Sequence, residues 1–336
     1  MKRNFKPFAV IPSLLLLAAC GSATNPAASA NSVIVGSAAS AEVLPLDVGL
    51  QKGIYSAKGV DLIKISAVGI APALAALESD SANVVLQSPV LAATSAQRGG
   101  DAKMFCGLIS RNWLSVYANP GAGVQPASGP GGWKAAVESW KGKSVGVAAL
   151  GSSLQAAVEN VLKAAGIDTG SVRFVSVGQG AQAVAALTSG SVDLLVSFPF
   201  QSQLISPADA ELALDFSNDL PADLGNQQLA AVMARKSWLD SHADLAKAFC
   251  DGIGESIAVA KDPANADTAK SVLSSEFGLT GNDQLTSALS ARGPLSYLSS
   301  EINCAGVEAI LKNAKSRGDL QPTTSTSCDD YTWKHG

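Results

Sequence analysis

The chain has 336 residues, of which only 15% are charged, and its formal net charge at pH 7 is −4. A sparsely charged, slightly acidic chain lacks the basic surface that nucleic acid requires, so composition argues against a nucleic-acid partner. Its length exceeds that of one usual domain and predicts two lobes.

The N-terminal segment is basic at first and then apolar from residue 8 to residue 19. This pattern is typical of a secretory signal, and the apolar run is shorter than the roughly 20 residues that span a bilayer. It ends in Leu-Ala-Ala-Cys, which resembles the bacterial lipobox. We therefore expect a lipoprotein signal peptide at 1–19, a lipidated Cys20 and a flexible tether at 20–32. The alternative is an ordinary cleaved signal followed by a coincidental cysteine.

Short apolar runs alternate with helical patterns through the next part of the chain. This alternation predicts βαβ units and an α/β fold with mainly parallel sheets and flanking helices. In chain order, we expect strands at 33–36, 60–65, 83–86 and 103–109, with helices at 42–52, 72–78 and 89–97 between them.

A loop rich in Gly and Pro, 119–132, interrupts the pattern before it restarts. The helix expected at 154–165 carries its apolar residues at steps of three and one, which places them in one stripe. Beyond residue 228, a strand-like run precedes a helix-rich tail, where Phe249 and Ile253 share a helix face. The other elements expected here are strands at 144–149, 172–177, 192–197 and 229–234, and a helix at 181–189.

Two segments of the chain are similar at a constant offset of 110 residues. Residues 75–89 and 185–199 each predict a helix, a tight turn, a buried strand and a proline just after the strand. Asn83 corresponds to Asp193, for which we expect a structural hydrogen bond. The repeat indicates two lobes built from one unit, although chance similarity of alanine-rich helices is an alternative.

Four cysteines remain besides Cys20, and an even number in an exported protein favours disulfides. We favour the Cys304–Cys328 pair, because these residues are close in sequence and frame the C-terminal tail, which leaves Cys106 with Cys250. No pair has the spacing of metal ligands, so no metal site is expected.

In open α/β sheets, ligands bind beyond the carboxyl ends of the strands. Ser152 and Ser153 follow a strand and open a helix, where free N–H groups attract anions; the alternative is that they only cap the helix. Phe198 could instead fill the core, and Arg111 could be a solvated surface side chain. The expected ligand-contact residues are Ser37, Ala38, Gly69, Ile70, Gln87, Ser88, Arg111, Trp113, Ser152, Ser153 and Phe198.

Catalytic patterns find little support. The chain has two histidines, His242 and His335, and neither a Gly-x-Ser-x-Gly elbow nor a phosphate-loop signature. We therefore expect a binding protein without a cofactor and not an enzyme.

Three stretches resemble the family of solute-binding proteins that serve nitrate, sulfonate, taurine and thiamine-precursor importers. They are QKGIYSAKGVDL at 51–62, WKGKSVGV at 140–147 followed by Gly-Ser-Ser at 151–153, and AALTSGSVD at 185–193. The similarity covers roughly residues 33–275 and rests on the order and spacing of the stretches.

This resemblance implies a periplasmic-binding-protein-like fold, in which two α/β lobes enclose a ligand cleft. The two crossing segments would lie near 117–119 and 228–231. The implied organisation is lobe 1 at 33–118, lobe 2 at 119–228, and a return to lobe 1 with a helical tail at 229–336.

The resemblance also implies an exported, monomeric protein, anchored to the bacterial membrane by its lipid. It would bind a small solute and deliver it to the permease of an ABC importer. The solute expected first is an anion of the sulfonate or nitrate type, and a neutral heterocycle such as a thiamine precursor is the alternative. Two alternatives are a ligand-sensing lipoprotein and an enzyme of the thiamine-precursor type on the same scaffold. The chemistry of that enzyme relies on a His and Cys cluster that this chain lacks.

Overall fold

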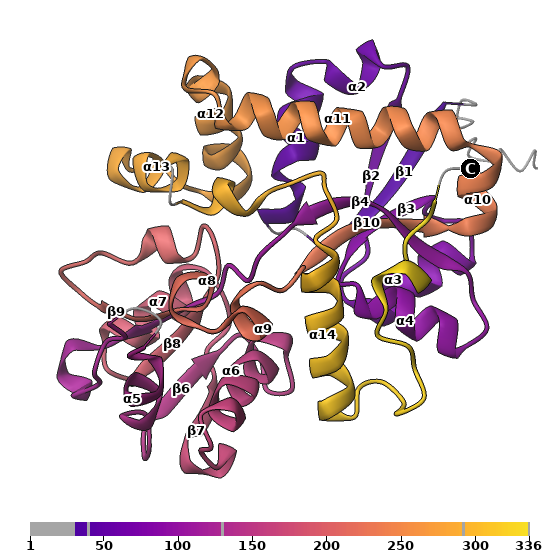
Figure 1. Cartoon of the computed structure of the whole chain (residues 1–336). Coiled ribbons are helices and arrows are strands. Elements are labelled where there is room, and N and C mark those ends of the chain that lie inside the picture. Colours follow the sequence, from indigo (N-terminus) through magenta and orange to yellow (C-terminus); the bar gives the residue numbers. More distant parts are fainter. Residues whose placement is uncertain (1–30, 39–40, 129–130, 291–292, 335–336) are drawn as a thin grey trace, which may run out of the picture. The chain divides into compact units, whose positions relative to one another are not determined.

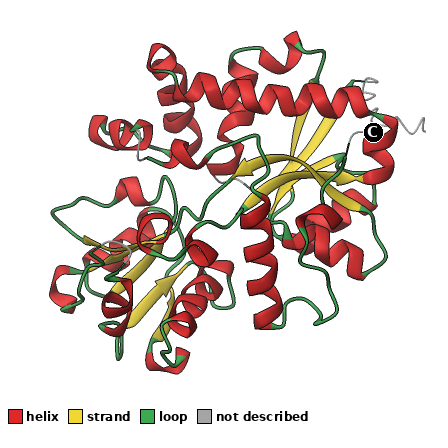
Figure 2. Ribbon diagram, viewed as in Figure 1, coloured by secondary structure: helices red, strands yellow, loops and turns green. Residues whose placement is uncertain are grey.

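Two five-stranded sheets with flanking helices form the computed structural model (Figures 1 and 2). The structure describes residues 31–38, 41–128, 131–290 and 293–334, and residues 31–336 form one compact unit. The expected signal peptide, Cys20 and most of the tether lie outside the described residues. Within them, no helix is both long enough and apolar enough to cross a bilayer.

The first sheet has the order β2-β1-β3-β10-β4 and forms lobe 1 together with its helices. Its strands β1, β2 and β3 are parallel, whereas β10 runs antiparallel to both β3 and β4. The strands are β1 (Ser32–Ser37), β2 (Asp61–Ser66), β3 (Val84–Gln87), β4 (Ala102–Ile109) and β10 (Ala230–Arg235), and the early helices are α1 (Leu44–Gln51), α2 (Ile54–Ala57), α3 (Ile70–Glu78) and α4 (Val90–Gln97).

The second sheet has the order β7-β6-β8-β5-β9 and forms lobe 2. Here β6, β7 and β8 are parallel, and β5 runs antiparallel to β8 and β9. The strands are β5 (Ser115–Ala118), β6 (Ser144–Val147), β7 (Arg173–Ser176), β8 (Leu194–Ser197) and β9 (Glu211–Asp215), and the helices are α5 (Trp133–Glu138), α6 (Ser153–Ala164), α7 (Ala181–Thr188), α8 (Phe216–Asp219) and α9 (Ala222–Gly225).

The C-terminal helices return to lobe 1 (Figure 1). They are α10 (Lys236–Ser241), α11 (Ala243–Lys261), α12 (Ala266–Phe277), α13 (Asn282–Leu289) and α14 (Cys304–Arg317). As predicted, Phe249 and Ile253 of α11 are fully buried, and they join α1 in the core on one face of the sheet. On the other face, α3, α4 and α14 form a second apolar cluster with side chains such as Leu74, Leu91 and Leu311.

The α/β architecture with two sheets is confirmed, but each sheet is mixed, with two parallel and two antiparallel pairings. The first crossing was expected near 117–119, and this position is wrong. Ser115–Ala118 is strand β5 of the second sheet, so the chain crosses at 110–114. The second crossing links α9 to β10 at 226–229, slightly before the expected 228–231.

The repeat seen in the sequence is also a repeat of strand register. Val35 pairs with Val84 in lobe 1, and 110 residues later Val145 pairs with Leu194 in lobe 2. The outer pairs keep the same offset, because β1 pairs with β2 as β6 pairs with β7. The three-stranded parallel core of each lobe is thus one unit used twice.

The counterparts Asn83 and Asp193 make the same bond in the two lobes. Asn83 Oδ1 accepts a hydrogen bond from the N–H of Ile34 at 2.9 Å, and Asp193 Oδ2 accepts one from the N–H of Ser144 at 2.7 Å. The hydroxyl of Ser144 donates to the same carboxylate at 2.7 Å. Burial opposes the ionisation of Asp193, but these bonds and the nearby Lys143 and Arg173 outweigh it and hold its pKa below the ordinary value.

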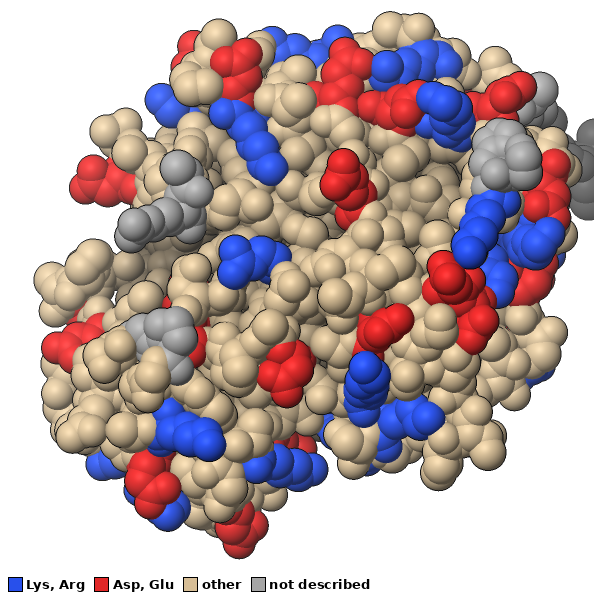
Figure 3. Space-filling model, viewed as in Figure 1, with Lys and Arg blue, Asp and Glu red and all other residues tan. Residues whose placement is uncertain are grey.

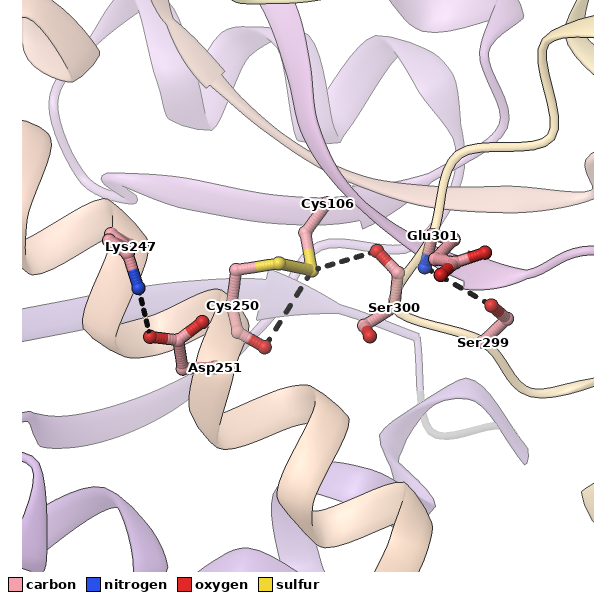
Figure 4. The surroundings of a disulfide bond; sticks show 7 residues. All are labelled: Cys106, Lys247, Cys250, Asp251, Ser299, Ser300 and Glu301. Carbon is pink, nitrogen blue, oxygen red and sulfur yellow. Dashed lines mark hydrogen bonds and ion pairs between the residues drawn. A yellow bond between two sulfur atoms is a disulfide. The ribbon is translucent and has the colours of Figure 1, made fainter. Parts of the chain in front are cut away.

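Both expected disulfides are present, Cys106–Cys250 and Cys304–Cys328. Cys106 lies on β4 and Cys250 on α11, so the first disulfide joins the sheet of lobe 1 to the helix that covers it (Figure 4). Cys106 Sγ also lies 3.5 Å from the carbonyl oxygen of Ser300, where the C-terminal segment passes. The 144-residue separation of the first pair includes the whole second sheet.

Replacing the two cysteines of a disulfide by alanine should destabilise the folded chain. We expect the loss to be larger for the pair Cys106–Cys250 than for the pair Cys304–Cys328. The chain-entropy model gives about 5 kcal/mol for the 144-residue separation and about 3.5 kcal/mol for the 24-residue one. Urea unfolding of the two double variants measures the difference. Cys106 and Cys328 are both almost fully buried, whereas Cys250 is half-buried and Cys304 exposed, so lost packing adds to the loss at Cys106–Cys250. A larger loss for the shorter loop would contradict the expectation.

Asp193→Asn should make lobe 2 less sensitive to acid. A carboxyl whose folded pKa is depressed stabilises the folded state above its unfolded pKa, near 3.9, and loses that contribution as the pH falls through the folded pKa. We expect the variant to be about 1 kcal/mol less stable than wild type at pH 7, with the gap closing below pH 4. Urea unfolding at pH 7, 5 and 3 tests this, with Asp209→Asn on an exposed turn as the control. A gap independent of pH would show that the charge does not matter.

Candidate ligand-binding site

Hydrogen bonds of backbone groups and amide side chains join the two crossing segments. The backbone N–H of Asn112, in the first crossing, donates to the carbonyl oxygen of Gly225 at 3.0 Å. The side-chain amide of Asn303 donates to the carbonyl oxygen of Ser110 at 2.9 Å and to Oδ1 of Asn226 at 3.1 Å, so it contacts both crossings. Gln228 Oε1 accepts the N–H of Asn303 at 2.9 Å. The crossings are therefore held side by side.

The C-terminal segment pairs with the edge of β4 and continues to the first crossing. The N–H of Gly107 donates to the carbonyl oxygen of Ser300, and the N–H of Ser110 donates to that of Tyr297, each at 2.8 Å. A Cβ atom at Gly107 would lie 2.0 Å from the carbonyl oxygen of Glu301, so the close approach requires glycine. These bonds hold Tyr297 next to the point where the chain leaves lobe 1.

A cavity of about 750 Å³ lies between lobe 2 and this C-terminal region. Trp113, Ser115 and Tyr117 line it from β5 and the residues before β5, and Asp215 and Asp219 line it from the end of β9 and α8. Its opposite wall comes from the segment that begins in α13, with Ser287, Ser290, Gly293, Pro294 and Tyr297. Trp113 packs against the core clusters of both lobes, which places it at their junction.

The charged groups of the described lining are carboxylates. Asp215 caps α8 and accepts the N–H groups of Ser217 at 2.9 Å and Asn218 at 3.2 Å. Asp219 accepts the N–H of Asp215 at 2.8 Å, but burial, with the charge of Asp215, raises the pKa of Asp219 above its usual value.

Two tyrosines, Tyr117 and Tyr297, line the same cavity as these carboxylates. Burial, followed by the charge of Asp215, raises the pKa of both Tyr117 and Tyr297 above the ordinary phenol value. Both phenols therefore stay protonated at neutral pH, and their hydroxyls remain able to donate hydrogen bonds. The lining combines neutral donors, aromatic faces and negative charge.

Beside the cavity, Phe200 of lobe 2 inserts into the core of lobe 1. Its side chain is 4% exposed and its ring centroid lies 4.3 Å from that of Phe277 on α12. The backbone of Phe200 has φ = 72°, a left-handed conformation that costs energy for a bulky residue. In the repeat, Phe200 corresponds to Val90, which begins helix α4. Lobe 2 departs from lobe 1 at this residue and uses it for contact between the lobes.

The residues predicted in lobe 1 lie at the carboxyl ends of its strands. Ser37 ends β1 and is buried, and Ala38 after it is half-buried. Gln87 and Ser88 follow β3, where Gln87 Oε1 accepts the N–H of Ser88 at 2.9 Å. Gly69 precedes α3 with φ = 90°, and Ile70 begins the helix and packs on the lobe 1 core.

The residues predicted in lobe 2 lie at equivalent places. Ser152 caps α6, since its Oγ accepts the N–H of Gln155 at 3.4 Å, and Ser153 is exposed at the start of the helix. Phe198 packs against the lobe 2 core. Arg111 is exposed and donates from Nη2 to the carbonyl oxygen of Ser217 at 2.7 Å.

Of the eleven predicted contact residues, Trp113 alone lines the cavity. Tyr117, Asp215, Asp219 and Tyr297 were not predicted. The alternation of Ser115-Val-Tyr117-Ala could have indicated a strand with Ser115 and Tyr117 on one face. Tyr297 has no local signal, because only the pairing of its segment with β4 brings it here.

Other sites find no support in the part of the chain that the structure describes. No group of His, Cys, Asp and Glu side chains there could hold a metal ion. On the face drawn in Figure 3, Lys and Arg are interspersed with Asp and Glu, without a large area of one sign.

Two mixed sheets joined by two crossings, with a cavity at their junction, define the periplasmic-binding-protein fold. The model of the NMT1/THI5-like family matches residues 40–266, so the chain belongs to that family. No curated protein matches the chain at a significant level.

Solved structures confirm the fold. The periplasmic aliphatic sulphonate binding protein SsuA of Escherichia coli has a TM-score of 0.71 at 14% identity, over 92% of this chain and 94% of SsuA. A protein of Bordetella bronchiseptica RB50 has a TM-score of 0.66 at 22% identity, over 91% of this chain and 95% of that protein. The periplasmic nitrate-binding protein NrtA of Synechocystis PCC 6803 has a TM-score of 0.64 at 16% identity, over 89% and 85%.

Phe200→Ala should loosen the contact between the lobes. The variant removes the ring that packs on Phe277, so the lobes should separate more readily and the radius of gyration from small-angle X-ray scattering should increase. Phe198→Ala is the matched control, because Phe198 packs within lobe 2. Phe200→Ala should cost about 3 kcal/mol, as buried Phe→Ala changes do, and Phe198→Ala should cost less because its side chain is only half-buried. Equal radii for the two variants would show that Phe200 does not hold the lobes together.

Proposed function

We propose that this chain is the solute-binding component of an ABC importer, and that it holds a small molecule between its lobes. The observation that carries the proposal is the cavity of about 750 Å³ with walls from lobe 2 and from the segment that returns to lobe 1. Its volume lies within the roughly 300–1,000 Å³ of small-molecule sites. Its lining includes three aromatic side chains, Trp113, Tyr117 and Tyr297, and half of its residues are polar, so it can combine stacking with hydrogen bonding.

Recognition works through closure of the lobes. A solute that touches both walls binds the closed arrangement more tightly than the open one and shifts the equilibrium toward closure. Phe200 and Phe277 add an apolar contact that exists only when the lobes are together. The closed, loaded form then docks on a membrane permease and releases the solute.

The strand-end residues form the second part of the proposed site. Ser152 and Ser153 stand at the N-terminus of the 12-residue helix α6, where free N–H groups favour a sulfonate or nitrate-like anion. Ser37, Ala38, Gly69, Ile70, Gln87, Ser88, Arg111 and Phe198 remain proposed contacts. The basic and apolar N-terminal pattern supports export, and its Leu-Ala-Ala-Cys end supports a lipid anchor at Cys20. The protein would act as a monomer without a cofactor.

A sensor that passes closure to a membrane receptor would use the same site, and interaction with the permease distinguishes the two roles. Catalysis has less support. The imidazole of His242 stacks on Trp238 with ring centroids 5.0 Å apart, and it does not line the cavity. His335 lies outside the described residues.

Binding should appear as thermal stabilisation of the protein by one class of small solute. A ligand at 100 times its Kd adds about 2.7 kcal/mol to the free energy of unfolding. The panel would contain alkanesulfonates, taurine, nitrate, sulfate esters, pyrimidines and flavins.

Two variants locate the bound solute. Tyr297→Ala should abolish the shift if the cavity holds the solute, and Ser152→Ala/Ser153→Ala should abolish it if the start of α6 holds an anion. A shift retained in both variants would contradict both locations. No shift with any compound would count against the proposed binding function for these solutes.

A further inference from the structure

Helix α14 belongs to lobe 1 but also contacts lobe 2. It lies between α4 of lobe 1 and α9 of lobe 2 (Figure 1). Val307, Leu311 and Ala314 are fully buried in the second apolar cluster of lobe 1. Away from this cluster, the side-chain amide of Asn313 donates to the carbonyl oxygen of Asp223 in α9 at 3.3 Å. The helix is therefore fixed to one lobe and reaches the other.

The first turn of α14 is tied to lobe 1 and lies against the second crossing. Cys304, the first residue of the helix, is bonded to Cys328, which is almost fully buried in the same apolar cluster. A Cβ atom at Gly306 would lie 2.6 Å from the carbonyl oxygen of Asn226 and 2.6 Å from the backbone nitrogen of Gln228. This contact between the helix and the crossing leaves no room for a side chain.

Asn303 caps this turn and contacts both crossings. Its Oδ1 accepts the N–H of Gly306 at 3.1 Å, while its Nδ2 donates to the carbonyl oxygen of Ser110 at 2.9 Å and to Oδ1 of Asn226 at 3.1 Å. The backbone N–H of Asn303 donates to Oε1 of the buried Gln228 at 2.9 Å. One residue of lobe 1 therefore bonds to the two segments through which the chain enters and leaves lobe 2.

The two crossings are the covalent connections between the lobes, because both disulfides lie within lobe 1. Any change in the angle between two packed lobes must therefore turn backbone torsions within residues 110–114 and 226–229. Hydrogen bonds depend steeply on distance and angle. The bonds of Asn303 to Ser110 and Asn226 thus favour one arrangement of the crossings, the arrangement seen here.

We propose that residues 303–306 form a brace that sets the equilibrium between arrangements of the lobes, with Asn303 as its positioning residue. This inference rests on the proposed function, in which closure of the lobes captures a solute. Asn303 is not among the described residues that line the cavity, so it acts on the lobes and not on the solute. Affinity scales with the population of the binding-competent arrangement, so the brace changes the affinity for every solute by the same factor.

Asn303→Asp separates the brace from the helix cap. Aspartate still accepts the N–H of Gly306, and it caps helices about as well as asparagine does. Its carboxylate cannot donate to Ser110 or Asn226. The loss of one such hydrogen bond should raise the population of other lobe arrangements about fivefold.

The distance between the lobes measures this change without a solute. Ala75 on α3 and Ala185 on α7 are exposed and equivalent in the repeat. Spin labels at these two positions, attached through unnatural residues so that the disulfides stay intact, report the distance by double electron–electron resonance. We expect Asn303→Asp to have a broader distance distribution than wild type.

Asn119→Asp is the matched control. Asn119 also accepts a backbone N–H in a helical turn, that of Gly121, and donates from Nδ2 to the carbonyl oxygen of Leu187, each at 2.9 Å. All three residues belong to lobe 2. This variant should lose a comparable hydrogen bond and keep the wild-type distances.

Asn226→Ala is a milder change to the same brace. It removes the bond from Asn303 to Oδ1 of Asn226 and keeps the bond to Ser110, so it should broaden the distribution less than Asn303→Asp. This variant decides the question if Asn303→Asp does not fold.

The outcomes distinguish the brace from the proposed function. Wild-type distances in the Asn303 and Asn226 variants, or equal broadening in Asn119→Asp, would overturn the brace and leave the binding function in place. Failure of every compound in the solute panel would count against the binding function, while the distances would still show whether Asn303 holds the lobes.

Discussion

The arrangement of the lobes depends on the amide side chains that join the two crossing segments. Irregular backbone in a buried place must find partners for its N–H and C=O groups, because leaving them unpaired is costly. Asn112 and Gln228 are almost fully buried and bond to backbone groups near the crossings, while Asn303 contacts both segments. These bonds therefore hold the two crossing segments side by side at the place where the lobes join.

The same three-stranded unit occurs in both lobes, and part of the candidate site lies where the two copies differ. The register of the parallel strands and the bond at Asn83 or Asp193 are the same in both lobes. After Pro89 the chain forms α4, whereas after Pro199 it turns through a left-handed Phe200 toward β9. The strained Phe200 and part of the cavity lining, from Pro199 to Asp219, lie in this divergent part of lobe 2. Strain is tolerated there in exchange for contact.

Elements with strong local patterns could be predicted from the sequence, and the cavity could not. Apolar runs and the 110-residue repeat predicted the parallel strands, and cysteine spacing led to the correct disulfide pairing. Strand β5 was missed because its four residues stand next to a loop rich in Gly and Pro, and this error displaced the first crossing. Tyr297 reaches the cavity because its segment pairs with β4, which is far away in the sequence. Asp219 reaches it through the exact backbone geometry of α8, the helix that Asp215 caps.

The position of Cys106–Cys250 also determines how tension would pass through the molecule. The disulfide joins two places in lobe 1 that lie just before and well after the whole second sheet. A pull on the two ends of the chain would be carried across the disulfide, and the residues between the cysteines would bear none of it. The covalent path from one end of the chain to the other thus bypasses lobe 2. If the protein were held at its N-terminus and pulled at its C-terminus, the sheet of lobe 2 would not be stretched.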